Sequence, residues 1–140
     1  MLETVPTATR WLITLATLAY GFGPFVTDMN RTHLLHPAWP GHARFHLLWA
    51  SGAQLLVASV ALWLVWSDGP EGLWRCRLAG VLGLCSVAGF GGALLFMKSY
   101  GGALHDRNGI PPLGGKVDGN LLAVGLIGGL LVSGLWLTLR

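Results

Sequence analysis

The chain has 140 residues, of which 53% are hydrophobic and only 11% are charged, and its formal net charge is +3. Soluble domains carry about 25% charged residues, so this composition excludes an ordinary soluble domain and indicates an integral membrane protein. The nine Lys and Arg residues are spread along the chain and form no cluster that follows a phosphate backbone, which excludes nucleic acid as a partner.

Four apolar runs predict an all-α fold, a four-helix transmembrane bundle in a single membrane domain that covers residues 1–140. Each run approaches the roughly 20 residues that a helix needs to cross a bilayer, and none shows the strict alternation of a strand. Basic residues are divided almost evenly between the two sides, so the positive-inside rule leaves the orientation open. The spans are expected near residues 11–27, 41–66, 78–98 and 119–139.

The end of the first span combines a helix breaker with an acid. Pro24, preceded by Gly21 and Gly23, predicts that the helix kinks or ends there, because proline removes one backbone donor and crowds the preceding turn. Asp28 follows about one turn later, at the membrane boundary, where a carboxylate is costly and usually faces a protein interior or a wet cavity. Asn30 either stops the helix through local hydrogen bonds or contacts a substrate.

The second helix is expected to begin within a residue or two of Pro40, because proline suits the first turn of a helix. His42 and His46 then lie one turn apart on one helical face, which Trp49 and Ala53 continue. An imidazole directed at hydrocarbon is costly. We therefore expect this face to be directed into the bundle.

Polar residues collect on one side of the membrane, because four spans place all five histidines there together with Asp28, Asp106 and Asp118. Imidazole serves as acid or base near neutral pH, and a neighbouring carboxylate holds it in one tautomer and stabilises its charged form. We expect the Asp28 carboxylate within hydrogen-bond reach of at least one of His33, His42 and His46. These four side chains are the candidate catalytic residues of an isomerase-like or cyclase-like proton transfer on a lipophilic substrate.

Two other functions fit the same residues. His42 and His46, with Asp28 or His33, supply three nitrogen or oxygen ligands for a zinc or iron ion with an open coordination position. In the third reading the chain is a non-catalytic accessory subunit, whose histidines cap helices and bind lipid headgroups.

Further polar and aromatic residues near this side are candidates for substrate binding. Trp39 and Trp49 also suit an aromatic belt, Arg44 suits contact with headgroups, and the amide of Gln54 suits hydrogen bonds between helices. The full set of candidates is Asn30, His36, Trp39, Arg44, Trp49, Gln54, His105 and Asp118.

The connector 98–120 is long and rich in Gly and Pro, which predicts a lid over the site. Asp118 or Asn120 is well placed to cap the fourth helix. The third and fourth spans carry small residues four positions apart, a spacing that lets helices approach closely within the bundle or across a homodimer. These pairs are Ala88 and Gly92, Gly89 and Ala93, and Gly125 and Gly129.

One stretch resembles a known pattern. The segments 28–33, DMNRTH, and 37–46, PAWPGHARFH, are similar to the signature D-x-N-x-T-H…P-x-W-P-x-H-A-[RK]-F-H of an uncharacterised family of small four-helix membrane proteins. This resemblance implies a four-helix membrane fold and brings no function with it.

A looser likeness, in architecture, is to the emopamil-binding and sigma-2 receptor group. Its members have an acid at the end of the first helix and a Pro/Trp-containing start to the second; they bind sterol-like molecules within the bundle, and some isomerise a sterol double bond. By position this likeness carries over only Asp28. The acid that the group places within its second helix has no counterpart here, where Ser51 and Gln54 are the nearest polar residues.

Overall fold

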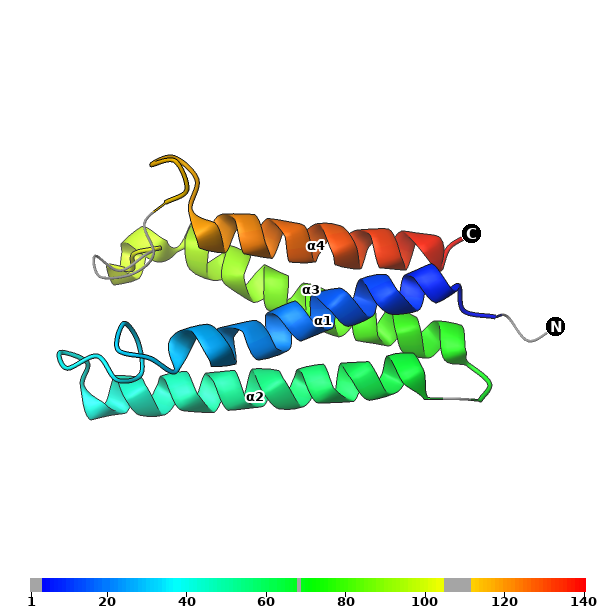
Figure 1. Ribbon diagram of the computed structural model, residues 1–140, viewed down its shortest axis with the longest axis horizontal. Coiled ribbons are helices and arrows are strands. Elements are labelled where there is room, and N and C mark those ends of the chain that lie inside the picture. The colour runs from blue at the N-terminus through cyan, green and yellow to red at the C-terminus, as the bar shows by residue number, and fades with distance from the viewer. Residues whose placement is uncertain (1–3, 68, 105–111) are drawn as a thin grey trace.

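A computed structural model of the chain describes residues 4–67, 69–104 and 112–140. The described residues form four long α-helices and one short 3-10 helix, which confirms the all-α prediction (Figure 1). Their bounds are Thr7–Asp28 for α1, Gly41–Trp66 for α2, Gly72–Leu95 for α3, Met97–Tyr100 for η1 and Gly119–Leu137 for α4.

Among the described residues, three helices, α2, α3 and α4, are long and apolar enough to cross a membrane. They contain 26, 24 and 19 residues, and at 1.5 Å per residue the shortest is about 29 Å long, close to the ~30 Å hydrocarbon thickness of a bilayer. These dimensions are consistent with a multi-pass membrane protein.

The start of α2 confirms the prediction made from Pro40, since the helix begins at Gly41 with Pro40 at its N-cap. The predicted break at Pro24 is wrong as a helix end, because α1 continues through Pro24 to Asp28. Proline removes a single hydrogen bond, and α1 continues for about one more turn despite that loss. The helix ends instead where the side chain of Asn30 caps it.

α3 begins at Gly72, ahead of the predicted residue 78, and so includes two arginines, each of which has carbonyl partners. The Arg75 guanidinium donates to the carbonyl oxygens of Gly69 and Pro70 at 3.0 and 2.8 Å. The Arg77 guanidinium donates to the hydroxyl of Thr138 at 3.1 Å and to the carbonyl of the same residue, which ties α3 to the end of α4.

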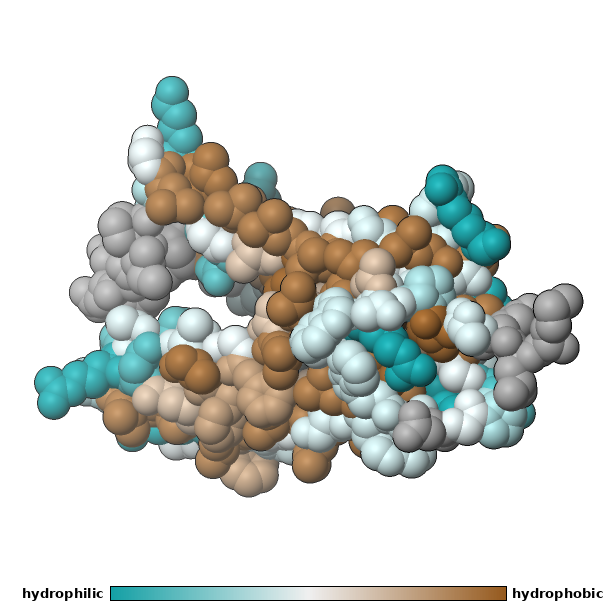
Figure 2. All heavy atoms as spheres, turned by 45° about the vertical axis from the view of Figure 1, so that its right-hand side comes forward, coloured by the Kyte–Doolittle hydropathy of each residue, from teal (hydrophilic) through white to brown (hydrophobic). Residues whose placement is uncertain are grey.

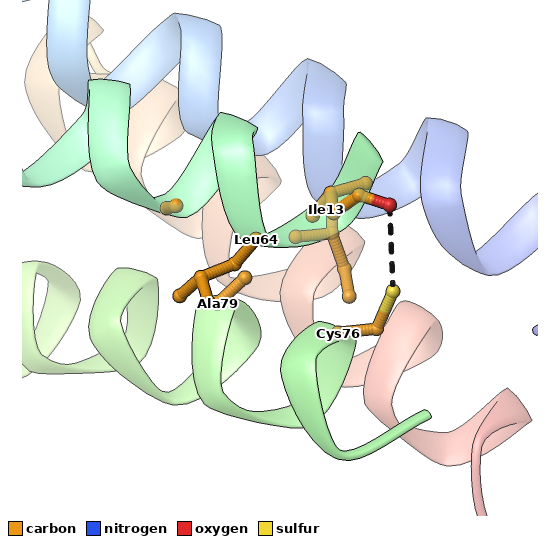
Figure 3. Packing of buried hydrophobic residues seen from close by; sticks show 6 residues of the cluster. Ile13, Leu64, Cys76 and Ala79 are labelled. Carbon is orange, nitrogen blue, oxygen red and sulfur yellow. Dashed lines mark hydrogen bonds between the residues drawn. The ribbon is translucent and has the colours of Figure 1, made fainter. Parts of the chain in front are cut away.

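Buried side chains occupy one half of the molecule. One cluster joins α1, α2 and α3 through Ile13, Leu64, Cys76 and Ala79, with the Cys76 thiol directed at the carbonyl oxygen of Val65 (Figure 3). A second cluster joins α1, α2 and α4 and consists of Ala16, Tyr20, Ala58, Ile127 and Leu131. The core therefore lies towards the start of α1 and α3 and the end of α2 and α4.

Close helix contacts depend on glycines other than the predicted ones. A Cβ added at Gly21 would lie 2.1 Å from the Cβ of Ala58, and one at Gly83 would lie 2.8 Å from the side chains of Tyr20 and Leu131. The predicted pairs do not pack tightly within the bundle. The helix pairs have diverged at Gly89, Gly92 and Gly125, and Gly129 lies on an exposed face of α4. The homodimer alternative stays a prediction. A Cβ would meet open space at Gly89, Gly92, Gly125 and Gly129.

Candidate functional site

The bundle is packed at one end and open at the other. In the described part of the chain, burial stops after Gly21 in α1 and after Gly83 in α3, and it begins only at Ser51 in α2 and Ile127 in α4. Towards the other end α3 and α4 diverge from α1 and α2 (Figure 1). Figure 2 shows the molecular surface hollowed at that end. We call the space between the two helix pairs the wedge.

Helical periodicity indicates which residues of each helix face the wedge. Residues three or four apart share a face of a helix, so the buried face of each helix can be continued residue by residue into the open end. On α2 this continuation runs from Ala58 through Gln54 and Ser51. Apart from buried Ser51, the residues reached in this way are half-buried: Pro24, Asp28, Arg44, Leu47, Gln54, Ser86, Phe90 and Val124.

A polar contact closes the wedge at its deep end. The Gln54 amide nitrogen donates to the Ser86 hydroxyl at 2.7 Å, which joins α2 to α3. Gln54 therefore makes the interhelical hydrogen bond that its depth suggested. Ser86 was missed by the sequence analysis, although it is a hydroxyl residue in an otherwise apolar run. Beyond this contact, the buried hydroxyls of Thr17 and Tyr20 have no partner at hydrogen-bonding geometry among the described residues.

Arg44 lies at the mouth of the wedge. It is half-buried, and one terminal nitrogen of its guanidinium donates to the carbonyl of His36 at 2.7 Å. Its Nε is buried and has no hydrogen-bond partner among the described residues. The guanidinium therefore combines a fixed position with an unused donor, whereas headgroup contact alone would leave it extended into solvent.

His42 and His46 lie on the outer face of α2, so the prediction that they face the bundle is wrong. Both side chains are exposed, and so is Trp49, which is 62% exposed. The reason is angular: at 100° per residue, two steps along the helix place His42 and His46 almost opposite Arg44. The helix buries the Arg44 face against its neighbours, and the histidine face is left outside.

The two imidazoles contact each other. Their Nε2 atoms lie 3.1 Å apart, and the ring planes are inclined by 81°. The His46 ring also packs near Trp49, with 5.7 Å between ring centroids. One imidazole donates to the other, so the pair holds a shared proton at the surface of the molecule.

Asp28 is not joined to a histidine by a hydrogen bond in the part of the chain that the structure describes. Its carboxylate accepts from the Thr27 hydroxyl at 3.0 Å, and its backbone carbonyl accepts from the amide of Leu34 at 3.0 Å. His33 instead pairs its Nδ1 with the hydroxyl of Thr32 at 2.8 Å. The predicted assembly of Asp28, His33 and the two helical histidines into one catalytic group is therefore not formed.

Local hydrogen bonds and one ring contact hold the turn between α1 and α2. The Asn30 side chain donates to the carbonyl of Thr27 at 2.5 Å and accepts from the amide and hydroxyl of Thr32 at 2.8 and 2.6 Å. His36 accepts from the amide of Ala38 through its Nδ1 at 3.2 Å, and the Trp39 ring stacks edge-on against His33 with 5.9 Å between centroids. Asn30 and His36 thus have structural partners, which favours the helix-stop reading of Asn30.

Asp118 caps α4, as the sequence suggested it or Asn120 would do. Its carboxylate accepts from the amides of Asn120 and Leu121 at 2.8 and 3.4 Å. The Asn120 side chain donates to the carbonyl of Leu104 at 3.0 Å and links the two described parts of the connector. A cavity of about 580 Å³ lies beside it, lined by Met97, Gly102, Ala103, Leu104, Pro112, Gly115, Lys116 and Asp118.

Part of the predicted lid lies outside the described residues. His105 belongs to the stretch 105–111, so its predicted role is not tested. The ends of the connector are ordered by local contacts, among them a hydrogen bond from the hydroxyl of Tyr100 to the carbonyl of Ala93 at 2.8 Å. The lid remains a prediction.

The predicted zinc or iron site is not assembled. Within the described ranges, no group of three or more His, Cys, Asp or Glu side chains is arranged to hold a metal ion. Asp28 and His33 lie in or beside the interhelical turn, and His42 and His46 point away from the bundle, so the four do not converge.

Comparison with known proteins gives no relative: no family model matches the chain, and no curated protein or solved structure matches it either. The resemblance of residues 28–46 to the four-helix membrane family, and the looser likeness to the emopamil-binding and sigma-2 receptor group, stay predictions. Functional inference therefore depends on the geometry of the wedge.

Proposed function

We propose that this chain is an integral membrane protein whose four helices all cross the bilayer, and that it binds a lipophilic molecule in the wedge. α1, with 22 residues, is about 33 Å long, and its outward side chains recur every three or four residues. These side chains are apolar and 40–53% exposed, as expected of a helix that contacts lipid: Trp11, Leu15, Leu18 and Phe22.

The composition of the wedge supports binding of a molecule with an apolar body and a polar head. Leu47, Phe90 and Val124 offer apolar surface between the diverging helices, and small-molecule sites are mostly apolar with a few placed polar groups. Arg44 supplies a charged donor at the mouth, and the bonded pair of Gln54 and Ser86 supplies polar atoms at depth. The single observation that carries the proposal is the end of burial at Gly21, Ser51, Gly83 and Ile127.

Binding is better supported than catalysis. Acid–base transformation of a substrate needs both a proton donor and an acceptor near it, and two of the candidate histidines face away from the wedge. Asp28 is a half-buried carboxylate at the end of α1, on the face that helical periodicity continues into the wedge, so an isomerase-like reaction here would depend on Asp28. We therefore propose a lipophilic ligand first and proton transfer only at Asp28.

Photo-crosslinking tests the binding site. Purified protein in lipid nanodiscs is exposed to a photoreactive sterol or a photoreactive fatty acid, and the labelled peptides are identified by mass spectrometry. We expect labels on the inner faces of α2 and α3. The variant Leu47→Trp should reduce labelling because its indole fills the wedge, whereas Leu56→Trp, at a position that is 70% exposed on the outer face of α2, should not.

Melting curves of both tryptophan variants serve as the folding control. Labels that fall only on outward residues such as Leu56, or equal labelling of the Leu47→Trp variant and the parent protein, would overturn the proposal.

A further inference from the structure

We infer that His42 and His46 form a two-ligand chelating site for a late first-row divalent cation, such as Zn²⁺, Cu²⁺ or Ni²⁺, on the outer face of α2. The inference goes beyond the ligand-binding function proposed for the wedge, because the two histidines lie on the opposite face of the helix from Arg44. It depends on how the two imidazoles are held relative to each other.

The separation of the two ring nitrogens fits a shared metal ion. Their Nε2 atoms are 3.1 Å apart, and imidazole nitrogens bind zinc at about 2.0–2.1 Å. Two such bonds to one ion enclose an angle of about 98° at the metal, between the octahedral 90° and the tetrahedral 109° values. On binding, the donating ring changes tautomer: its Nε2 proton is lost to solvent and its Nδ1 takes up a proton from solvent. Both neutral rings then carry their proton on Nδ1, and both Nε2 lone pairs are free to bind the ion.

The helix holds the two ligands in place before the ion arrives. Residues four apart stack one turn above the other on the same face, so chelation needs little backbone movement. Phe45 and Trp49 flank His46 with ring centroids 5.8 and 5.7 Å away, which limits the orientations of its imidazole. Both histidines are exposed, so an ion reaches them from solvent at the start of α2.

The ligand chemistry selects the class of cation. Imidazole suits Zn²⁺, Cu²⁺ and Ni²⁺, whereas Ca²⁺ and Mg²⁺ prefer oxygen ligands. Among the described residues no third His, Cys, Asp or Glu completes the set, so the remaining coordination positions are open to water or to a ligand from outside the chain. This differs from a structural zinc site, which is closed by four protein ligands.

Titration of detergent-solubilised protein, purified without a polyhistidine tag, tests the site. At near-neutral pH, where imidazole is largely neutral, calorimetry with Zn²⁺ should report one ion per chain. Titration with Cu²⁺ should quench tryptophan fluorescence, because Trp49 lies beside His46. Calorimetric titration with Mg²⁺ should report no binding at the concentrations at which Zn²⁺ binds.

Variants at single positions test whether His42 and His46 bind the ion together, or whether any histidine of the chain binds it. His42→Ala and His46→Ala should each weaken Zn²⁺ binding by at least about tenfold, since loss of a direct ligand costs no less than the loss of a supporting group around a metal site. His36→Ala is the matched control, because this histidine lies in the connector and bonds to the amide of Ala38. It should keep the parent affinity.

Three results would overturn the inference: Zn²⁺ affinity unchanged in both His42→Ala and His46→Ala, an equal loss in His36→Ala, or Mg²⁺ binding as tight as that of Zn²⁺. Both variants replace exposed side chains, so we expect them to fold, and a melting curve for each confirms it. None of these results bears on the wedge, so the two proposals fail independently.

Discussion

Arg44 shows how one side chain acquires a role from its position on a helix. Its guanidinium is held by the carbonyl of His36 and keeps a buried Nε without a partner among the described residues. The Nε is buried out of a ligand's reach, so a ligand would accept its hydrogen bond from the terminal nitrogen that is not bonded to His36, and a charged donor makes that bond stronger. His42 lies two residues earlier and is also polar, yet its side chain is exposed whereas that of Arg44 is half-buried.

Replacing Arg44 should therefore lower the affinity for acidic ligands more than the affinity for neutral ones. A hydrogen bond to a charged group contributes about 1.5–3 kcal/mol, so Arg44→Gln should weaken binding of a fluorescent fatty acid about ten- to hundredfold. Binding of a fluorescent neutral sterol should change little. Fluorescence titration in nanodiscs measures both affinities.

Arg31→Gln is the matched control for this experiment, because Arg31 is an exposed arginine at the same end of the molecule. It should leave both affinities unchanged. An equal loss of fatty-acid binding in the two variants would mean that net charge at the surface, and not Arg44 in the wedge, attracts the acid.

At the scale of the helices, the glycines of α3 divide into two groups. Gly80 and Gly83 lie where α3 meets α4, and an added Cβ would come within 2.7–2.8 Å of Leu135 or Leu131. Gly89, Gly91 and Gly92 lie further along the helix, where an added Cβ would meet nothing within 4 Å. A single helix is thus packed at its start and unpacked at its end, although glycine is frequent in both parts.

Alanine substitutions in α3 test this difference directly. Gly83→Ala forces side chains of the core to move and should destabilise the protein by about 1–3 kcal/mol. Gly89→Ala adds a methyl group in open space and should be neutral or stabilising by up to about 1 kcal/mol, because alanine favours the helix over glycine. Unfolding in mixed micelles with increasing denaturing detergent measures both; similar destabilisation by the two variants would contradict the packing described for α3.

On the scale of the whole molecule, stability is concentrated at the packed end. Polar contacts reinforce the apolar clusters there: Arg10 donates to the carbonyl of Val65 and stacks over the ring of Trp66, whose indole nitrogen donates to the hydroxyl of Thr14 at 2.9 Å. At the open end the described contacts between α2 and α3 include the hydrogen bond from Gln54 to Ser86. Local opening requires few broken contacts where few side chains are buried.

Hydrogen exchange should reveal this gradient. In detergent, backbone amides of residues 22–28, 41–50, 86–95 and 119–126 should exchange faster than those of residues 9–21, 51–65, 76–83 and 127–137. A bound lipophilic probe should slow exchange at the open end more than at the packed end. Uniform protection along all four helices would contradict the wedge as a region of low local stability.

The helices can be predicted from the sequence because the residue patterns that indicate them are local. Long apolar runs predict the helical segments, and Pro40 marks the start of α2 because its missing amide hydrogen is not needed there. Pro24 shows the limit of a local pattern. A proline inside an apolar run predicts either a kink or a helix end, and the helix-end alternative is wrong because α1 continues to Asp28.

The candidate site shows what a local pattern leaves undecided. The one-turn spacing of His42 and His46 determines that they share a face and contact each other, and the structure agrees. Which way that face points is set by the neighbouring helices: α2 buries Ser51 and Ala58 against them, so the histidines are left outside and Arg44 is directed inwards. The sequence by itself determined the helices and the face that each residue occupies, because both follow from short-range periodicity. Only tertiary packing decided which face is inside, because that depends on contacts between residues far apart in the chain.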